Sequence, residues 1–203
     1  MSGGLFVSLE GPDGSGKSTQ AQLLIEALAA NNPLLVREPG GTEVGEEVRR
    51  VVLHTRLEMS REAEMYLYMA ARAELVDKQI RPALAAGRLV IADRYHDSTL
   101  AYQGGGRGAR VVWPDEFPKP DLTILLNVPA EAGLDRQLRG RGGFDRLESE
   151  PADFHRAVVA AYRALAAAEP GRWRVVDASA AAPDVHRAVM EAIRPLLPAE
   201  VHR

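Results

Sequence analysis

Cysteine is missing from all 203 residues. A chain without cysteine forms no disulfide scaffold and no cysteine-based metal site. Its composition fits the reducing cytoplasm, where we expect the protein to be. No segment is apolar over the length needed to cross a bilayer. The N-terminal MSGGLFVSLE has neither the basic region nor the long apolar region of a secretory signal peptide, so we expect no membrane association.

An excess of positive charge is also missing. The formal net charge is -3, so no global basic field attracts nucleic acid, and any anion site must be local. We find no internal repeat and no linker between domains. A length of 203 residues suits one compact domain, and we predict a single domain over residues 1–203.

What the sequence does contain is an alternation of short apolar runs and longer helical patterns. The runs are nearly continuous in apolar residues, which is typical of parallel strands buried on both faces. An α/β fold follows, with a parallel sheet of about five strands flanked by helices and ligands bound beyond the carboxyl ends of the strands. The predicted strands are 5–9, 34–37, 89–93, 122–127 and 173–177, and the predicted helices are 17–30, 43–54, 60–81, 130–139, 151–168 and 183–197.

Capping and breaking residues refine this prediction. Ser60 is placed to cap the helix predicted at 60–81, and Pro82 should bend or break it. The stretch 104–121 carries four glycines and three prolines and is predicted to be a loop. The stretch 138–150 is polar, rich in arginine and interrupted by glycine, as a moving loop over a site would be.

The segment from Gly11 to Ser18 fits the Walker A pattern G-x-x-x-x-G-K-[ST], between a predicted strand and a predicted helix. Glycines let backbone amides close round phosphate oxygens, and the start of the helix adds its dipole. A chance glycine-rich turn is the alternative, but the strand and helix favour phosphate binding. We predict that ATP and Mg²⁺ bind here, with Lys17 at the β- and γ-phosphates and Ser18 at the metal. The predicted ATP-binding residues are Gly11, Pro12, Asp13, Gly14, Ser15, Gly16, Lys17, Ser18 and Thr19.

The segment LVIADRYHDSTLAYQGGG carries candidates for a second site. Asp93 should stand at the carboxyl end of a strand, where it would reach the metal shell, and Arg94 suits bidentate phosphate recognition. A structural ion pair between the two is the alternative. Ser98, Tyr102 and Gln103 would line a polar site or simply pack a short helix.

Two further segments offer site residues. Tyr68 and Arg72 lie four residues apart on one helix face, where they would stack a base and bond its edge, or would be a core tyrosine and a surface arginine. In REPGGTEVGEEVRR, the side chains of Arg37, Glu38 and Arg49 would face the cleft or form solvated ion pairs.

These segments together, in their order along most of the chain, resemble the thymidylate kinase family. The resemblance is carried by EGPDGSGKST, REPGGTEVGEEVR, YMAAR, DRYHDSTLAYQG and DRLE. It implies a P-loop NTPase fold with a short lid at about 138–150, transfer of the γ-phosphoryl group of ATP to dTMP, and a homodimer. Another nucleoside monophosphate kinase, or a nucleotide-dependent switch, remains an alternative.

The resemblance also implies roles. Asp13 would contact the sugar 3′-hydroxyl, Tyr102 would exclude a 2′-hydroxyl, and Arg49 and Arg94 would hold the acceptor phosphate near Glu38. Tyr68 would stack on the base, Arg72 would bond its edge, and Ser98, Thr99 and Gln103 would lie near the acceptor. Because Gly14 stands where some members carry a P-loop arginine, the lid should supply it, from Arg139, Arg141 or Arg146. The implied catalytic residues are Lys17, Asp93, Arg94, Arg139 and Arg141.

Overall fold

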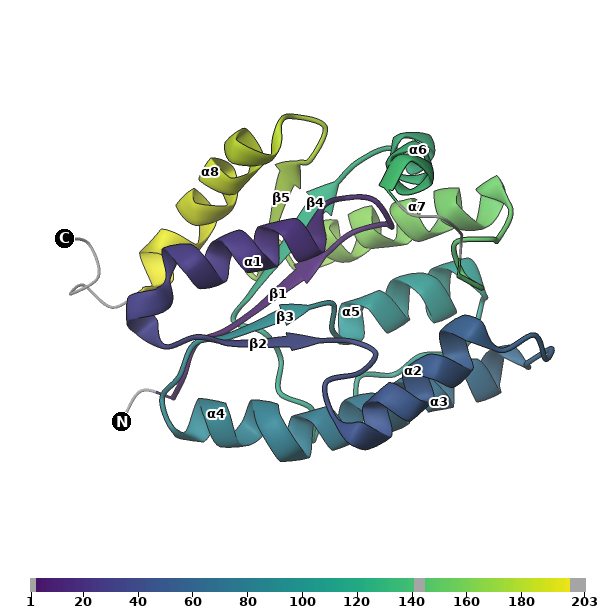
Figure 1. Cartoon of the computed structure of the whole chain (residues 1–203), viewed down its shortest axis with the longest axis horizontal. Coiled ribbons are helices and arrows are strands. Elements are labelled where there is room, and N and C mark those ends of the chain that lie inside the picture. Colours follow the sequence, from purple (N-terminus) through teal and green to yellow (C-terminus); the bar gives the residue numbers. More distant parts are fainter. Residues whose placement is uncertain (1–2, 141–144, 198–203) are drawn as a thin grey trace.

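The computed structural model describes residues 3–140 and 145–197. In that part of the chain, five parallel strands form one sheet in the order β2-β3-β1-β4-β5 (Figure 1). Their bounds are β1 Phe6–Glu10, β2 Leu34–Arg37, β3 Val90–Asp93, β4 Leu122–Asn127 and β5 Trp173–Asp177. The parallel five-stranded sheet and its flanking helices confirm the predicted fold class, and each strand lies within one residue of its predicted bounds.

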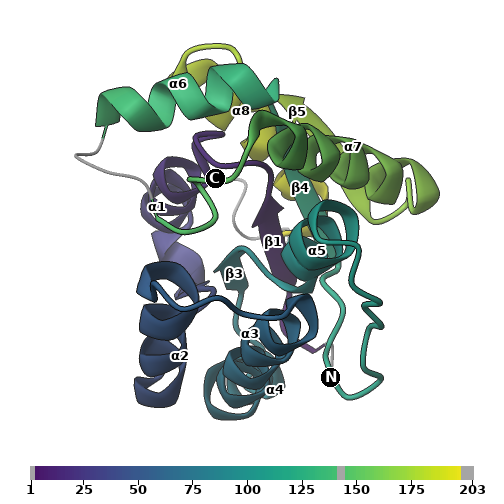
Figure 2. The same cartoon turned by 90° about the vertical axis from the view of Figure 1, so that its right-hand side faces the viewer.

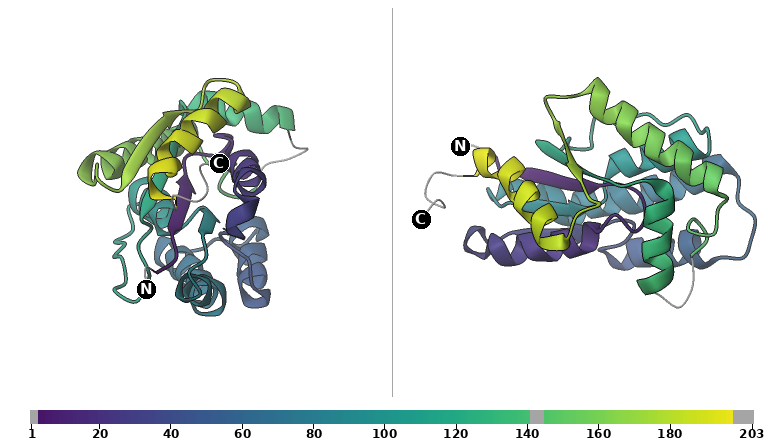
Figure 3. Two further views of the ribbon diagram at one scale, coloured as in Figure 1. Left: turned by 90° about the vertical axis from the view of Figure 1, so that its left-hand side faces the viewer. Right: turned by 90° about the horizontal axis from the view of Figure 1, so that it is seen from above.

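Helices cover both faces of the sheet (Figures 1 and 2). Seen from the left and from above, α1 and α8 lie side by side on one face, and α6 lies across the end of the sheet that carries the P-loop (Figure 3). The bounds are α1 Lys17–Ala27, η1 Ala29–Asn31, α2 Glu43–His54, α3 Arg61–Leu75, η2 Val76–Ile80, α4 Arg81–Ala85, α5 His96–Thr99, η3 Leu100–Gly106, α6 Ala130–Gly140, α7 Ala152–Ala168, α8 Ala182–Ile193 and η4 Arg194–Leu196. Among the described residues, no helix combines the length and the apolar character needed to cross a membrane.

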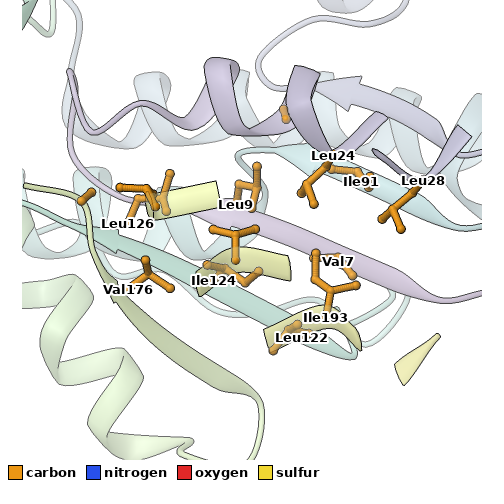
Figure 4. Packing of buried hydrophobic residues seen from close by; sticks show 14 of the residues in the cluster. Val7, Leu9, Leu24, Leu28, Ile91, Leu122, Ile124, Leu126, Val176 and Ile193 are labelled. Carbon is orange, nitrogen blue, oxygen red and sulfur yellow. The ribbon is translucent and has the colours of Figure 1, made fainter. Parts of the chain in front are cut away.

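The alternation of side chains along β1 determines which of them point to each face of the sheet. Val7 and Leu9 point into the apolar cluster formed with Leu24 of α1, with Leu28 directly after α1, and with Ile193 of α8 (Figure 4). Side chains alternate along a strand, so Phe6, Ser8 and Glu10 point to the opposite face. The last of these, Glu10, is fully buried at the carboxyl end of β1. A carboxylate is thereby buried directly beneath the P-loop.

The helix predicted at 60–81 begins as expected and extends beyond its predicted end. Ser60 caps α3, because its hydroxyl accepts a hydrogen bond from the Ala63 amide at 3.2 Å. Pro82 does not break the helix, so that part of the prediction is wrong. The chain changes to a π-helical segment, η2, and then continues as α4, with Pro82 in the first turn of α4. The helix thus accommodates the proline directly after its π-helical segment.

A helix over residues 96–106, formed by α5 and the π-helical η3, was not among the predicted helices, although a short helix was the alternative considered for Ser98, Tyr102 and Gln103. The loop prediction for 104–121 is wrong for its first three residues. The glycines there serve a close approach to α7. A Cβ on Gly105 would lie 2.4 Å from the Cβ of Ala161, and one on Gly106 would lie 2.5 Å from the ring of Phe154. Residues 107–121 have no helix or strand.

The other predicted helices match within a few residues. The last one ends at Ile193 and is followed by the short 3₁₀ turn η4, which contains Pro195. The first ends at Ala27 and is followed by η1. Of the predicted lid at 138–150, residues 141–144 lie outside the described part of the chain.

Candidate active site

The P-loop closes over the carboxyl end of β1 and leads into α1. Gly16 precedes the helix with a φ of 92°, a left-handed conformation that side chains rarely adopt. The Lys17 Nζ folds back to donate to the carbonyl oxygens of Gly11 at 3.0 Å and Pro12 at 2.8 Å. Burial and the nearby charge of Arg94 lower the pKa of Lys17 to about 8. The loop is thus ordered round its own lysine.

Ser18 and Asp93 meet at the mouth of this loop. The Ser18 hydroxyl donates to the Asp93 carboxylate at 2.6 Å, which joins the start of α1 to the end of β3. A hydroxyl and a carboxylate in contact suit Mg²⁺, which takes few protein ligands and keeps its remaining positions for water and phosphate oxygens. The described residues include no cluster of three or more histidine, aspartate or glutamate side chains that would form a fuller metal site.

Arg94 is the centre of the second group of polar residues. It follows β3 with a φ of 72°, the left-handed region, so its side chain turns back toward the P-loop. Its guanidinium donates to the Asp13 carboxylate at 2.5 Å, to the Tyr102 hydroxyl at 3.1 Å and to the Gly11 carbonyl at 3.1 Å. Burial alone would raise the pKa of Asp13, but the charges of Arg94 and Lys17 outweigh it and lower that pKa.

Beneath Arg94, the buried Glu10 organises a set of hydroxyl groups. Its carboxylate accepts from the Tyr95 amide at 2.7 Å, the Ser98 hydroxyl at 2.6 Å and the Tyr162 hydroxyl at 2.9 Å. The same two hydroxyl oxygens accept from Arg94, at 3.1 and 3.2 Å. Burial, followed by the charge of Asp97, raises the pKa of Glu10 to about 7. Arg94 is therefore held by a hydrogen-bonded network that includes Tyr162 of α7.

Arg72 lies behind the site rather than in it. It is 1% exposed and bonds the buried Glu38 carboxylate at 2.5 Å, the Thr99 hydroxyl at 3.0 Å and the Tyr95 carbonyl at 3.2 Å. Burial outweighs the charge of Arg72 and raises the pKa of Glu38. Tyr68 is 8% exposed, and its hydroxyl has no partner in the described part of the chain.

One cavity of about 740 Å³ connects these groups. Of the predicted residues, it is lined by Asp13, Gly14, Gly16, Lys17, Ser18, Thr19, Arg37, Glu38, Arg49, Tyr68, Asp93, Arg94, Ser98, Thr99, Tyr102 and Gln103. The predicted residues that do not line it are Gly11, Pro12, Ser15, Arg72, Arg139 and Arg146, and Arg141 lies outside the described residues. The structure therefore brings the nucleotide loop and most of the predicted acceptor residues to one opening.

Sequence reasoning missed several lining residues. They are Ala21, Gln22, Leu35, Pro39, Leu53, Arg136, Gln137, Asp145, Leu147 and Glu148. Arg136 and Gln137 belong to the helix that leads into the predicted lid, so their place in the sequence could have identified them. Leu35 and Leu53 give no such signal, because an apolar residue on a strand or helix predicts packing.

The arginines considered for the lid differ in their surroundings. Arg139 is exposed on the last turn of α6, whereas Arg141 lies outside the described residues. Arg146 donates to the Val52 carbonyl at 2.8 Å and pairs with Glu64 at 2.6 Å, so it is held between α2 and α3. The P-loop has no room for an arginine at position 14, since a Cβ there would lie 2.0 Å from the Gly133 carbonyl oxygen of α6.

A parallel sheet, a glycine-rich phosphate loop and a second polar pocket in the same cavity define a P-loop protein of the nucleotide kinase class. The sequence model of the family described as thymidylate kinase matches residues 9–189. The chain belongs to the thymidylate kinase family, which confirms the resemblance seen in its motifs.

Individual relatives agree. The chain is 47% identical to the thymidylate kinase of Roseiflexus sp. (strain RS-1), over 86% of each chain. It is 48% identical to that of Thermomicrobium roseum, over 86% of this chain and 87% of the relative. The crystal structure of thymidylate kinase from Ehrlichia chaffeensis superposes with a TM-score of 0.75 and 30% identity, covering 95% of this chain and 99% of that one.

Proposed function

We propose that the chain transfers the γ-phosphoryl group of ATP to dTMP, giving dTDP and ADP. The observation that carries this proposal is the shared cavity, in which Lys17 and Ser18 of the P-loop lie beside Arg94 and Tyr102. A nucleotide switch needs only the first pair, whereas a kinase must hold a second anionic substrate in line with the first. Membership of the thymidylate kinase family supports dTMP as that substrate.

On the donor side, the P-loop amides and the start of α1 would receive the ATP phosphates. Lys17 would exchange its present carbonyl partners for the β- and γ-phosphates. Ser18 and Asp93 would hold Mg²⁺, which would neutralise charge on the transferring group. Their hydrogen bond at 2.6 Å supports this assignment, because both oxygens already converge on one point.

On the acceptor side, Arg49 and Arg94 would hold the dTMP phosphate. This monoester is largely a dianion at neutral pH, since its second pKa is about 6, and it needs no strong base to become a nucleophile. The difficulty is instead its repulsion by ATP, which fixed guanidinium groups offset. The Arg49 guanidinium donates to the Pro39 carbonyl at 2.9 Å, which holds it at the cavity wall.

The sugar and base would occupy the remainder of the cavity. Asp13 would meet the 3′-hydroxyl and Tyr102 would exclude a 2′-hydroxyl. Tyr68, Thr99 and Gln103 would surround the base. Arg72 would act at the base edge only after an exchange of partners, because its guanidinium is bonded to Glu38 and Thr99.

The arginine at the transferring phosphoryl group would come from the lid, from Arg139 or Arg141. The contact between Gly14 and Gly133 supports this source, because it leaves no room for a P-loop side chain. Such an arginine contributes roughly 10³–10⁵ in rate in related systems. Closure of the lid would also exclude water as a competing acceptor.

A coupled ADP assay with a panel of monophosphates tests the proposal. With ATP and Mg²⁺ present, we expect ADP formation to depend strongly on dTMP and much less on dUMP, dCMP or a purine monophosphate. Equal stimulation by all of them would indicate a broader monophosphate kinase. Basal ADP release that no monophosphate stimulates would indicate a switch.

A homodimer in the cytoplasm completes the proposal. The family resemblance supports the dimer, and the exposed Val44 of α2 and Tyr66 of α3 provide apolar surface for it. Sedimentation velocity of the purified chain would distinguish a dimer from a monomer.

A further inference from the structure

Glu64, in the first turn of α3, is a buried carboxylate that none of the roles above uses. It is 1% exposed. Its oxygens accept a hydrogen bond from the Gln103 side-chain amide at 2.8 Å and pair with Arg146 at 2.6 Å and Arg107 at 3.4 Å. The two guanidinium groups come from the end of the predicted lid and from the end of η3, so they fix the carboxylate from two directions.

This arrangement determines which way the Gln103 amide faces. A carboxylate has only acceptor atoms, so the nitrogen of the amide must point to Glu64 and the carbonyl oxygen must be the other end. Gln103 lines the cavity, and among the described residues no hydrogen bond is formed to its side-chain oxygen Oε1; its main-chain carbonyl oxygen accepts from the Ala109 amide. The atom that Gln103 offers to a ligand is therefore an acceptor.

We infer that Glu64 is a positioning residue that makes Gln103 present an acceptor to the substrate base, and so selects a pyrimidine that carries a ring N–H. This inference rests on the proposed function. Thymine and uracil carry a proton on N3, whereas cytosine has a lone pair there. Two facing acceptors cannot form a hydrogen bond, so cytosine would leave both groups unpaired.

The test compares wild-type protein with Glu64→Gln, measuring kcat/KM for dTMP, dUMP and dCMP. A glutamine at 64 has an amide that can face either way, so it no longer fixes Gln103. We expect the preference for dTMP over dCMP to fall about tenfold or more. The preference for dTMP over dUMP should stay constant, because both bases carry the N3 proton. The KM for ATP should also stay constant.

Arg107→Gln is the matched control. It removes a charged partner of Glu64 but leaves the carboxylate and its hydrogen bond from Gln103. We expect a lower melting temperature and an unchanged preference for dTMP over dCMP. A loss of preference equal to that in Glu64→Gln would mean that general loosening of the region, rather than amide orientation, sets selectivity, and would overturn the inference.

The remaining outcomes are also decisive. If Glu64→Gln does not fold, Glu64→Asp takes its place, because it keeps the charge for both arginines and withdraws the oxygens from Gln103. A variant that loses the same factor on all three nucleotides would overturn the inference. So would a wild-type protein that uses dCMP as well as dTMP. A wild-type protein that uses no monophosphate would instead overturn the proposed function.

Discussion

Arg94 shows how one residue links backbone conformation to the site. Its φ of 72° is costly for a residue with a side chain, by roughly 1–2 kcal/mol, and glycine avoids that cost. We therefore expect Arg94→Gly to unfold with a free energy about 1 kcal/mol greater than that of Arg94→Ala, measured by urea denaturation. Both variants lose the same guanidinium contacts, so the difference between their unfolding free energies measures the cost of the left-handed backbone conformation.

Both Arg94 variants should also lose activity to the same extent. Two charge-assisted hydrogen bonds to the acceptor phosphate, each worth roughly 1.5–3 kcal/mol, correspond to a loss of at least about 100-fold in kcat/KM for dTMP. Equal stability of the glycine and alanine variants would show that the left-handed conformation stores no strain.

At the level of single residues, the sequence predicted which residues line the cavity better than it predicted how deeply they are buried. Lys17, Ser18, Asp93 and Arg94 were predicted because a phosphate loop and a charged strand end leave a local pattern. The burial of Arg72 was not predicted, since its partner Glu38 lies 34 residues away along the chain. Glu10 was missed for the same reason, because its partners come from α5 and α7.

Among the secondary-structure elements, α6 brings its backbone close against the P-loop. A Cβ on Gly133 would lie 2.3 Å from the Asp13 carbonyl oxygen, so the helix and the loop approach without a side chain between them. We expect Gly133→Ala to lower the free energy of unfolding by roughly 1–3 kcal/mol, as overpacked sites do, and to weaken ATP binding.

Gly171→Ala is the control for that variant, since a Cβ there meets nothing within 4 Å. Both substitutions replace glycine by alanine, and neither glycine has a positive φ. Denaturant melts and titration with a fluorescent ATP analogue measure the two effects. If the control and Gly133→Ala behave alike, the contact between α6 and the P-loop is not tight.

The strands were predicted closely, because apolar runs of four to six residues leave little choice of bounds. The errors in predicted secondary structure fall where packing between segments distant in the sequence determines the conformation. The helix at 96–106 carries three glycines, which predict a loop from local preference, yet they allow η3 to lie against α7. The prediction of a helix break at Pro82 failed for a similar reason, because the chain passes through the π-helical η2 and continues as α4.

For the molecule as a whole, buried acids should make folding stability depend on pH. Burial raises the pKa of Glu10 from 4.5 to about 7, and it also raises that of Glu38. The folded state therefore binds protons more tightly than the unfolded state at these positions. The contribution of Glu10 to stability is complete below pH 4.5 and is lost as the pH rises through about 7, and Glu38 adds a contribution of the same sign.

Glu10→Gln separates this effect from other titrating groups, because glutamine does not ionise. We expect the free energy of unfolding of the wild-type protein, relative to the variant, to fall by more than about 1 kcal/mol between pH 5 and pH 8. Urea denaturation at both pH values measures it. If the difference in unfolding free energy between wild type and variant is the same at pH 5 and pH 8, Glu10 does not change protonation over this range.

The pairing of Arg94 with Asp13 also affects how substrate binding depends on ionic strength. The guanidinium is already neutralised by a carboxylate at 2.5 Å, so an arriving phosphate displaces a tethered anion rather than meeting a bare cation. Substrate association then exchanges one ion pair for another and changes the number of released counterions little. Chloride and other simple salts should compete weakly at this arginine, because they would have to displace the same carboxylate without the contacts of a sugar and base.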